Sequence, residues 1–272
     1  MNYIQVQIAA KQEVVQEIVI ALLADNGFDG FETTNTYINA FIEEDNYSEN
    51  LVKKLLQPLH ISFTATVIEK QNWNELWESN FNPVVIDEFV GIRAHFHTPI
   101  SNVQHEIIIT PKMSFGTGHH ATTYTVMQLM QQINFTNKTV FDFGTGTGIL
   151  AILAEKLGAS KILAVDNDDW CIENSLDNIT TNHCNNIHIQ KADTASTAEK
   201  FDIVIANINK NIILDNVDLL NKAAKENGYI ILSGLLENDE QDILSISTQY
   251  AWQHIQTIAK NNWIAMLFKV KM

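Results

Sequence analysis

The amino-acid sequence predicts an α/β protein in two parts: a small α+β unit, then a larger unit built on a doubly wound sheet that ends in an antiparallel hairpin. Three observations lead to this prediction. Residues 1–67 alternate predicted strands and helices in the order β-α-β-β-α-β, whereas from about residue 83 single strands alternate with helices. The chain has 272 residues, 46% of them hydrophobic, which is enough to bury the cores of one large and one small domain.

The first unit begins with Tyr3–Ala9, where apolar and polar side chains alternate as in a half-buried strand. Apolar residues then recur at helical spacing until Asn26 and Gly27 stop the helix. The next expected elements are two strands, a helix and a last strand, at Phe28–Thr34, Thr36–Phe41, Asn50–Gln57 and Ile61–Val67. This order is the split βαβ pattern of ferredoxin-like domains, so we expect such a domain at residues 1–67.

Residues 68–82 are expected to link the two units through a short helix. Trp73 and Trp77 are four residues apart and would therefore lie on one face of this helix. We interpret the pair as an aromatic clamp between the linker and the second unit, which we place at residues 83–272.

The chain is acidic, with a formal charge of -15, and so is the first unit. Residues 1–66 contain nine Asp and Glu but three Lys, a net charge of -6. A surface of this sign repels phosphate backbones and attracts basic partners. An RNA-binding domain of the same topology would require basic residues and exposed aromatics on its sheet. The charge therefore favours a basic protein as partner and argues against direct nucleic-acid specificity.

No apolar run approaches the roughly 18 to 20 residues that a membrane-spanning helix needs. The N-terminus also lacks a basic region followed by an apolar stretch, as a secretory signal would have. We therefore expect a cytoplasmic protein that does not interact with membranes. Cys171 and Cys184 form no CxxC pair and are interpreted as buried or partly buried free thiols.

A glycine-rich loop follows the first strand of the expected doubly wound sheet. Thr139–Phe143 is a short apolar strand that leads into Gly-Thr-Gly-Thr-Gly, and Ile149–Leu157 continues as a helix. Glycines at alternate positions permit positive φ and let a ligand approach the backbone in front of a helix N-terminus. The spacing is GxGxG and not the GxGxxG of the nicotinamide fingerprint. Gly144 and Gly146 are thus candidate cofactor contacts, although tight turns without a ligand also use glycine.

An acidic residue stands at the end of the next strand, Lys161–Val165. Asp166 lies about twenty residues beyond the glycine loop, where a carboxylate can accept both hydroxyl groups of a ribose. It could instead cap the following helix, but Asp168 is well placed for that role. Ribose binding is therefore the favoured interpretation of Asp166.

The third and fourth strands also end in polar side chains. Asn186–Gln190 is expected as the third strand, and Asp193 after it is counted with the cofactor-binding candidates. The fourth strand, Phe201–Ala206, runs directly into Asn207.

Three further strands are expected to complete the sheet. The fifth strand is placed at Gly228–Ser233. The last two, Trp252–Ala259 and Trp263–Val270, are joined by a tight Asn-containing turn and should therefore form an antiparallel hairpin.

A doubly wound sheet with GxGxG after its first strand, an acid after its second and a hairpin at its end resembles the Rossmann-like class I S-adenosylmethionine-dependent methyltransferases. Three segments are more specific: Asn72–Glu78, Pro111–Thr123 and Phe141–Ile152. Together with the acidic first unit, they resemble the PrmA family of methyltransferases of ribosomal protein L-eleven, written L11 below, over essentially the whole chain.

The resemblance implies an activity and a cofactor site. The activity would be a ribosomal protein modification: transfer of methyl groups from S-adenosylmethionine to lysine ε-amino groups and the N-terminal α-amino group of L11. The residues that match the family's S-adenosylmethionine contacts are Thr123, Gly144, Asp166 and Asn207. The first unit would be the family's substrate-recognition domain. We also expect the side-chain oxygen of Asn207 to orient the acceptor amine.

The sequence departs from the family pattern beside two of these residues. Asn209 and Lys210 stand where the family usually has Leu and Ala. His119 and Ala121 stand where many members have Thr and Pro. Thr123 and Asn207 stay aligned, so the departures concern the shape of the acceptor mouth.

The loop before Thr123 contains two glycines and two adjacent histidines. We expect Gly116 and Gly118 to let this loop close over the methionine end of the cofactor, with Phe115 excluding water. Adjacent histidine side chains diverge, and no other ligand stands at helical spacing to complete a site, so no metal is expected.

Two other functions stay open. The first is a class I amino methyltransferase that acts on RNA or on another protein. Enzymes that methylate nucleic-acid amines commonly have two prolines and an aromatic residue after the fourth strand, which residues 207–209 lack. The second is a nucleotide-binding regulatory module without turnover, which an assay of labelled methyl transfer would distinguish.

Overall fold

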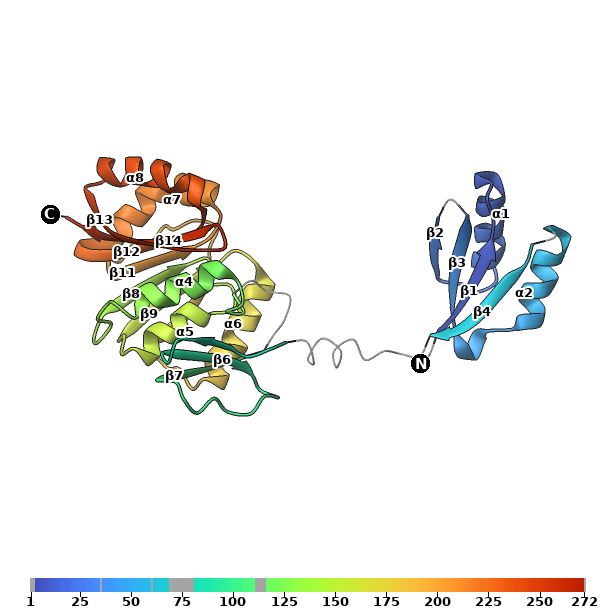
Figure 1. Cartoon of the computed structure of the whole chain (residues 1–272), viewed down its shortest axis with the longest axis horizontal. Helices are drawn as coiled ribbons and strands as arrows, with labels where there is room; N and C mark the ends of the chain where they lie inside the picture. Colours follow the sequence, from blue (N-terminus) through green and yellow to red (C-terminus); the bar gives the residue numbers. More distant parts are fainter. Residues whose placement is uncertain (1–2, 35, 60, 69–80, 111–115, 272) are drawn as a thin grey trace. The chain divides into compact units, whose positions relative to one another are not determined.

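The computed structural model describes residues 3–34, 36–59, 61–68, 81–110 and 116–271. The chain divides into two compact units, Met1–Asn80 and Phe81–Met272, and each is described separately (Figure 1). The expected linker helix with Trp73 and Trp77 lies outside the described residues.

The first unit is a four-stranded antiparallel sheet with two helices on one face (Figure 1). Its strands lie in the order β2-β3-β1-β4. Alternate residues of the central strand, Ile4, Val6 and Ile8, share a core with both helices. The elements are β1 (Tyr3–Ala9), α1 (Glu13–Ala24), β2 (Gly30–Thr33), β3 (Tyr37–Glu43), η1 (Glu44–Asn46), α2 (Glu49–Leu56), η2 (Gln57–Leu59) and β4 (Phe63–Ile68). The predicted order β-α-β-β-α-β is confirmed.

The second unit is organised around a seven-stranded sheet with the order β10-β9-β8-β11-β12-β14-β13. Strands β8 to β12 run parallel, and β14 runs antiparallel between β12 and β13. The strands are β8 (Thr139–Phe143), β9 (Lys161–Asp166), β10 (Ile187–Lys191), β11 (Phe201–Asn207), β12 (Ala224–Leu236), β13 (Trp252–Lys260) and β14 (Trp263–Val270). The helices are α4 (Ala121–Met130), α5 (Ile149–Lys156), α6 (Asp169–Thr181), α7 (Lys210–Ala223), η3 (Glu237–Asp239) and α8 (Glu240–Gln249).

The predicted parallel strands and the terminal hairpin are confirmed. Asn261 and Asn262 form the turn of the hairpin with φ of 52° and 65°. Such positive φ values suit asparagine and match the twist of the two strands. The fifth strand, predicted at Gly228–Ser233, is longer at both ends: β12 begins at Ala224 and continues past Ser233 through an irregular step in its pairing with β14.

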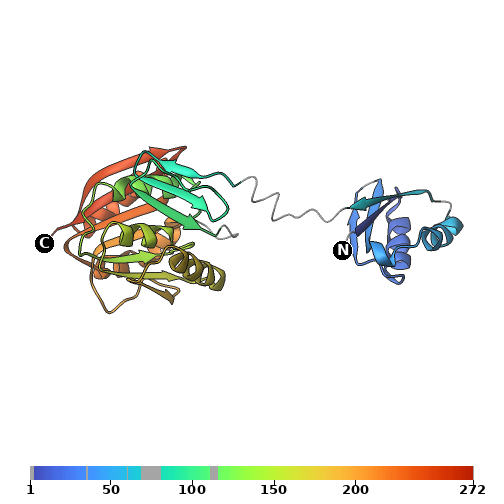
Figure 2. The same ribbon diagram turned by 90° about the horizontal axis from the view of Figure 1, so that it is seen from below.

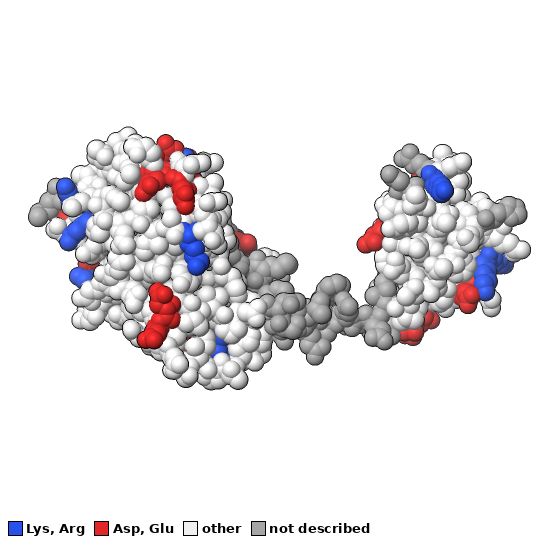
Figure 3. Space-filling model, viewed as in Figure 1, with Lys and Arg blue, Asp and Glu red and all other residues white. Residues whose placement is uncertain are grey.

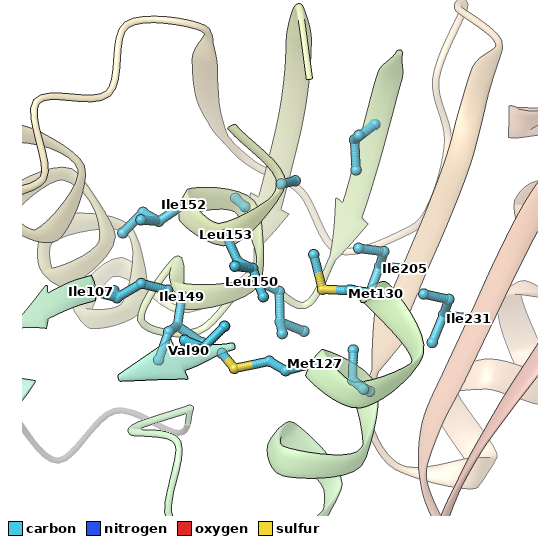
Figure 4. Packing of buried hydrophobic residues seen from close by; sticks show 14 of the residues in the cluster. Val90, Ile107, Met127, Met130, Ile149, Leu150, Ile152, Leu153, Ile205 and Ile231 are labelled. Carbon is cyan, nitrogen blue, oxygen red and sulfur yellow. The ribbon is translucent and has the colours of Figure 1, made fainter. Parts of the chain in front are cut away.

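A separate three-stranded sheet precedes the main sheet. It contains β5 (Val84–Ile86), β6 (Val90–Ala94) and β7 (His105–Ile109), with β5 antiparallel to β6 and β6 parallel to β7. The expectation that strands alternate with helices from residue 83 is therefore wrong for residues 83–109. The three strands instead form a cover for α4 and α5, so Val90 and Ile107 pack in one cluster with Met127 and Ile149 (Figure 4).

The main sheet is covered on both faces, as a doubly wound sheet requires (Figures 1 and 2). In β11, Ile203 and Ile205 belong to the core shared with α4, α5 and α6. Val204 and Ala206 belong to the core shared with α7 and α8. This alternation follows the pleat of the strand and leaves the strand ends free to form a site.

Among the described residues, no helix is both long and apolar enough to cross a lipid bilayer. Cys171 and Cys184 are half-buried, within the predicted range of burial, and no disulfide joins them.

Candidate functional site

A cavity of about 430 Å³ opens at the carboxyl ends of the parallel strands. This volume suits a small-molecule ligand. The strand order reverses between β8 and β11, and doubly wound sheets bind their ligands beside such a point. Five residues that were predicted from the sequence line the cavity: Gly144, Gly146, Asp166, Asp193 and Asn207. Thr123 lines a small recess beside it that shares Gly144, Gly146 and Asn207.

The glycine loop is held in place by the neighbouring strand. Gly144 and Gly146 have positive φ, 77° and 55°. The backbone amides of Gly144 and Thr145 both donate to the carbonyl oxygen of Val165 at 2.9 Å. A side chain at position 144 would place its Cβ 2.2 Å from Cγ2 of Ile208, so glycine is needed where the loop passes the end of β11.

Asp166 connects the end of β9 with the glycine loop. Its Oδ2 accepts from the amide of Gly146 at 2.8 Å, and its Oδ1 accepts from the amide of Asp168 at 3.1 Å. Asp168 caps α6 by accepting from the amide of Trp170 at 2.9 Å, so the predicted capping role is confirmed. Each carboxylate oxygen of Asp166 keeps a second lone pair for a ligand hydroxyl group.

We expect Asp166→Ala and Asp166→Asn to weaken S-adenosylmethionine binding about ten- to a hundredfold, since a hydrogen bond to a carboxylate contributes roughly 1.5 to 3 kcal/mol. Calorimetric titration of both variants measures this effect. Asp169→Ala is the matched control, because Asp169 is an exposed acid whose carboxylate pairs with Lys191. Unchanged affinity in both Asp166 variants would remove this carboxylate from the ligand site.

Asp142 is a buried acid under the glycine loop that the sequence analysis missed. It lies within β8, 1% exposed, and its Oδ2 accepts from the hydroxyl group of Thr145 at 2.6 Å. The pKa of Asp142 is raised to about 7, mainly by burial; the Thr145 hydrogen bond lowers this pKa, and the nearby Asp166 carboxylate raises it. One charged residue in the apolar run of residues 139–143 was the sequence signal for this group.

The raised pKa of Asp142 makes stability depend on pH. The carboxyl group binds its proton more tightly in the native state than in the unfolded chain, so its contribution is complete below pH 3.8 and is lost as the pH rises through about 7. Between pH 5 and pH 8, the unfolding free energy of the wild type should fall by about 2 kcal/mol relative to Asp142→Asn. Denaturant unfolding at both pH values measures this difference, and parallel pH profiles would contradict it.

Thr123 and Asn207 lie side by side, although 84 residues separate them in the chain. The amide nitrogen Nδ2 of Asn207 donates to the hydroxyl oxygen of Thr123 at 3.3 Å, and both residues are buried. The other amide atom, Oδ1 of Asn207, is buried and has no hydrogen-bond partner among the described residues. A buried unpaired carbonyl oxygen is costly, so this atom is suited to accept a hydrogen bond from a ligand.

Residues 116–120, the described part of the loop with the two histidines, are held by hydrogen bonds within the second unit. The hydroxyl group of Thr147 donates to the carbonyl oxygen of Gly116 at 2.6 Å. Nε2 of His119 donates to the carbonyl oxygen of Asn82 at 2.8 Å, whereas Nδ1 of His120 accepts from the amide of Thr122 at the start of α4. The two histidines thus point to different partners. Phe115 lies outside the described residues.

Sequence patterns also missed two aromatic residues of the cavity wall. Trp263, the first residue of β14, meets His120 edge to face with ring centroids 4.9 Å apart. Both residues line the cavity. The terminal hairpin therefore contributes a wall of the cavity. The sequence predicted the hairpin from its Asn-containing turn but gave no sign that it borders the site.

This sheet order, with a glycine loop and an acid at the switch point and an inserted antiparallel last strand, defines a class I S-adenosylmethionine-dependent methyltransferase. Residues 2–271 match the family described as "Ribosomal protein L11 methyltransferase (PrmA)". The chain belongs to this family.

Individual relatives agree with this assignment. A protein of Phocaeicola vulgatus named ribosomal protein L11 methyltransferase is 35% identical over 281 residues, which cover 100% of both chains. A protein of the same name from Bacteroides thetaiotaomicron is 34% identical over 94% of each chain. The crystal structure of a ribosomal protein L11 methylase from Lactobacillus delbrueckii subsp. bulgaricus superposes with a TM-score of 0.66, at 29% identity, over 71% of this chain and 100% of that one.

Proposed function

We propose that this enzyme transfers methyl groups from S-adenosylmethionine to lysine ε-amino groups and the N-terminal α-amino group of ribosomal protein L11. The family and the names of its relatives support this substrate. The observation that carries the chemistry is Oδ1 of Asn207, a buried oxygen without a partner among the described residues, at the edge of the cavity. A ribosomal substrate also supports a cytoplasmic location.

The residues of the cavity fit S-adenosylmethionine. Asp166 would hold the ribose hydroxyl groups, and the alternating glycines leave room for the ligand beside the loop backbone. Asp193, which lines the cavity, and Thr123, which lines the adjoining recess, would complete the binding site. When bound, the cofactor supplies an electrophilic methyl group.

The protein must supply a neutral and correctly oriented amine. A free lysine has a pKa near 10.4, so its ammonium group has to lose a proton before the nitrogen can accept a methyl group. The apolar wall formed by Phe143, Ile208 and Trp263 would desolvate the ammonium group and lower its pKa. Oδ1 of Asn207 would accept a hydrogen bond from the amine and so direct the lone pair toward the methyl group. Phe115 stays a candidate for excluding water when the loop closes.

Labelled S-adenosylmethionine and purified L11 test the proposal directly. We expect label on lysine side chains and on the N-terminal amine of L11, located by mass spectrometry. Label on RNA instead of L11 would favour the nucleic-acid alternative.

The first unit is proposed to recognise the substrate. Its acidic character suits a basic ribosomal protein, and the main sheet of the second unit takes no strand from it among the described residues. A chain that begins near residue 68 should therefore bind S-adenosylmethionine normally but lose most of its methyl transfer to L11. Calorimetry and initial rates measure the two effects. A full rate with intact L11 would assign recognition to the second unit.

A further inference from the structure

Lys210 follows Asn209, a residue that lines the cavity, and stands at a position where the sequence departs from the family pattern. It is the first residue of α7 and follows Asn207 by three positions. Its ammonium group donates to Oδ1 of Asp239 at 2.8 Å and to Oδ2 of Asp242 at 2.5 Å. The side chains of Lys210 and Asp239 are half-buried, 27% and 19% exposed, whereas that of Asp242 is exposed.

The position of this lysine is unfavourable without its two partners. A helix N-terminus carries partial positive charge, which repels a cation in the first turn. Asn209 provides no side-chain hydrogen bond to cap α7. Asp239 and Asp242 offset the charge of Lys210, and the pair with Asp239 anchors the start of the helix to another segment.

That segment continues directly from the end of β12. Oδ2 of Asp239 accepts from the amide of Leu236 at 2.9 Å, so one carboxylate joins Lys210 to the strand end. Closer to the cavity, the amide of Ile208 donates to the carbonyl oxygen of Ser233 at 3.1 Å. The loop at residues 207–209 is thus joined to the last part of β12 in two places. One connection starts from Ile208 within the loop, and the other starts from Lys210 directly after it. Acidic side chains gather over the α7 and α8 side of the domain in Figure 3.

We propose that Lys210 is a positioning residue, which through Asp239 fixes the loop at residues 207–209 and thereby sets the direction of the Asn207 side chain. The inference rests on the proposed function, in which Asn207 orients the acceptor amine. Without this ion pair, the loop would keep the Ile208 hydrogen bond but lose its second anchor. A shift of the Asn207 oxygen then lowers turnover more than binding.

The test compares Lys210→Met, which removes both ion pairs, with Lys210→Arg, which can keep them. At saturating cofactor, we expect Lys210→Met to lower kcat for L11 methylation about tenfold, with KM and cofactor Kd changed less than about twofold. Lys210→Arg should recover kcat to within about twofold of wild type. The matched control is Lys161→Met, which breaks the exposed Lys161–Glu199 pair at the start of β9. This variant should leave kcat, KM and cofactor Kd unchanged.

Hydrogen exchange at the Ile208 amide provides a measurement that needs no substrate. The proposal requires faster exchange in Lys210→Met and near-normal exchange in Lys210→Arg. Unchanged exchange or unchanged kcat in Lys210→Met overturns it, and so does an arginine variant no better than methionine. If the wild type fails to methylate L11, the proposed function fails, and exchange alone then decides whether Lys210 anchors the loop.

Discussion

Asn207→Ala is expected to lower single-turnover methyl transfer on the order of a hundredfold, while S-adenosylmethionine affinity changes far less. The reason is that Oδ1 of Asn207 is buried without a partner among the described residues. An oxygen that orients the amine acts mainly as the amine loses its proton and aligns with the methyl group, so its loss affects the rate. Single turnover at saturating cofactor measures the rate, and calorimetry measures affinity.

A structural role for Asn207 leads to a different outcome. If its side chain only closes the end of β11 through Thr123, the variant should melt at a lower temperature and keep its turnover per folded molecule. Thermal melting of the same preparation therefore separates the two roles. Asn102→Ala is the control, because this asparagine is exposed and does not line the cavity. A near-normal rate in Asn207→Ala would exclude the orienting role.

Gly234→Ala is expected to destabilise the second unit by about 4 kcal/mol, from a strained φ and from a steric clash together. Gly234 has φ of 82°, and an added Cβ would lie 2.1 Å from the carbonyl oxygen of Ile208. That oxygen belongs to the backbone and cannot rotate away, so either β12 or the loop at residues 207–209 has to move. Denaturant unfolding measures the loss of stability, and methyl transfer should fall with it.

Gly27→Ala measures the cost of backbone strain in the absence of a steric clash. Gly27 also has positive φ, 92°, but the nearest atom to an added Cβ is a side-chain carbon of Ile42 at 3.9 Å. This variant carries the strain alone and should lose only about 1 to 2 kcal/mol. Equal losses in the two variants would show that the contact between Gly234 and Ile208 is unimportant.

Local sequence patterns were sufficient to predict those parts of the site that a single segment of the chain forms. The glycines at 144 and 146 mark positive φ directly, and Asp166 stands at the end of an apolar strand. The strand order brings these groups together, because parallel strands end at the same edge. Thr123 was predicted only from the family resemblance, because the helical pattern around it does not indicate a contact with Asn207.

The other parts depend on contacts between distant segments. The small sheet was missed because β5 has only three residues, and β6 is buried throughout and includes Arg93. This arginine is paired with Glu106 through two hydrogen bonds, of 2.8 and 3.0 Å, that no local pattern predicts. Trp263 was missed as part of the site for the same reason, because its partner His120 lies in a segment far away in the chain.

The order of the main sheet also constrains synthesis on the ribosome. β14 pairs along Tyr229–Leu236 of β12, so this part of β12 has an unpaired edge until Trp263–Val270 have been translated and have left the exit tunnel. An exposed strand edge is a site for aggregation, and domains that rely on late segments stay incomplete during translation. The first unit forms its sheet from residues before 69 and can fold much earlier. A nascent chain therefore carries a folded N-terminal unit long before the Trp263 wall of the second unit exists.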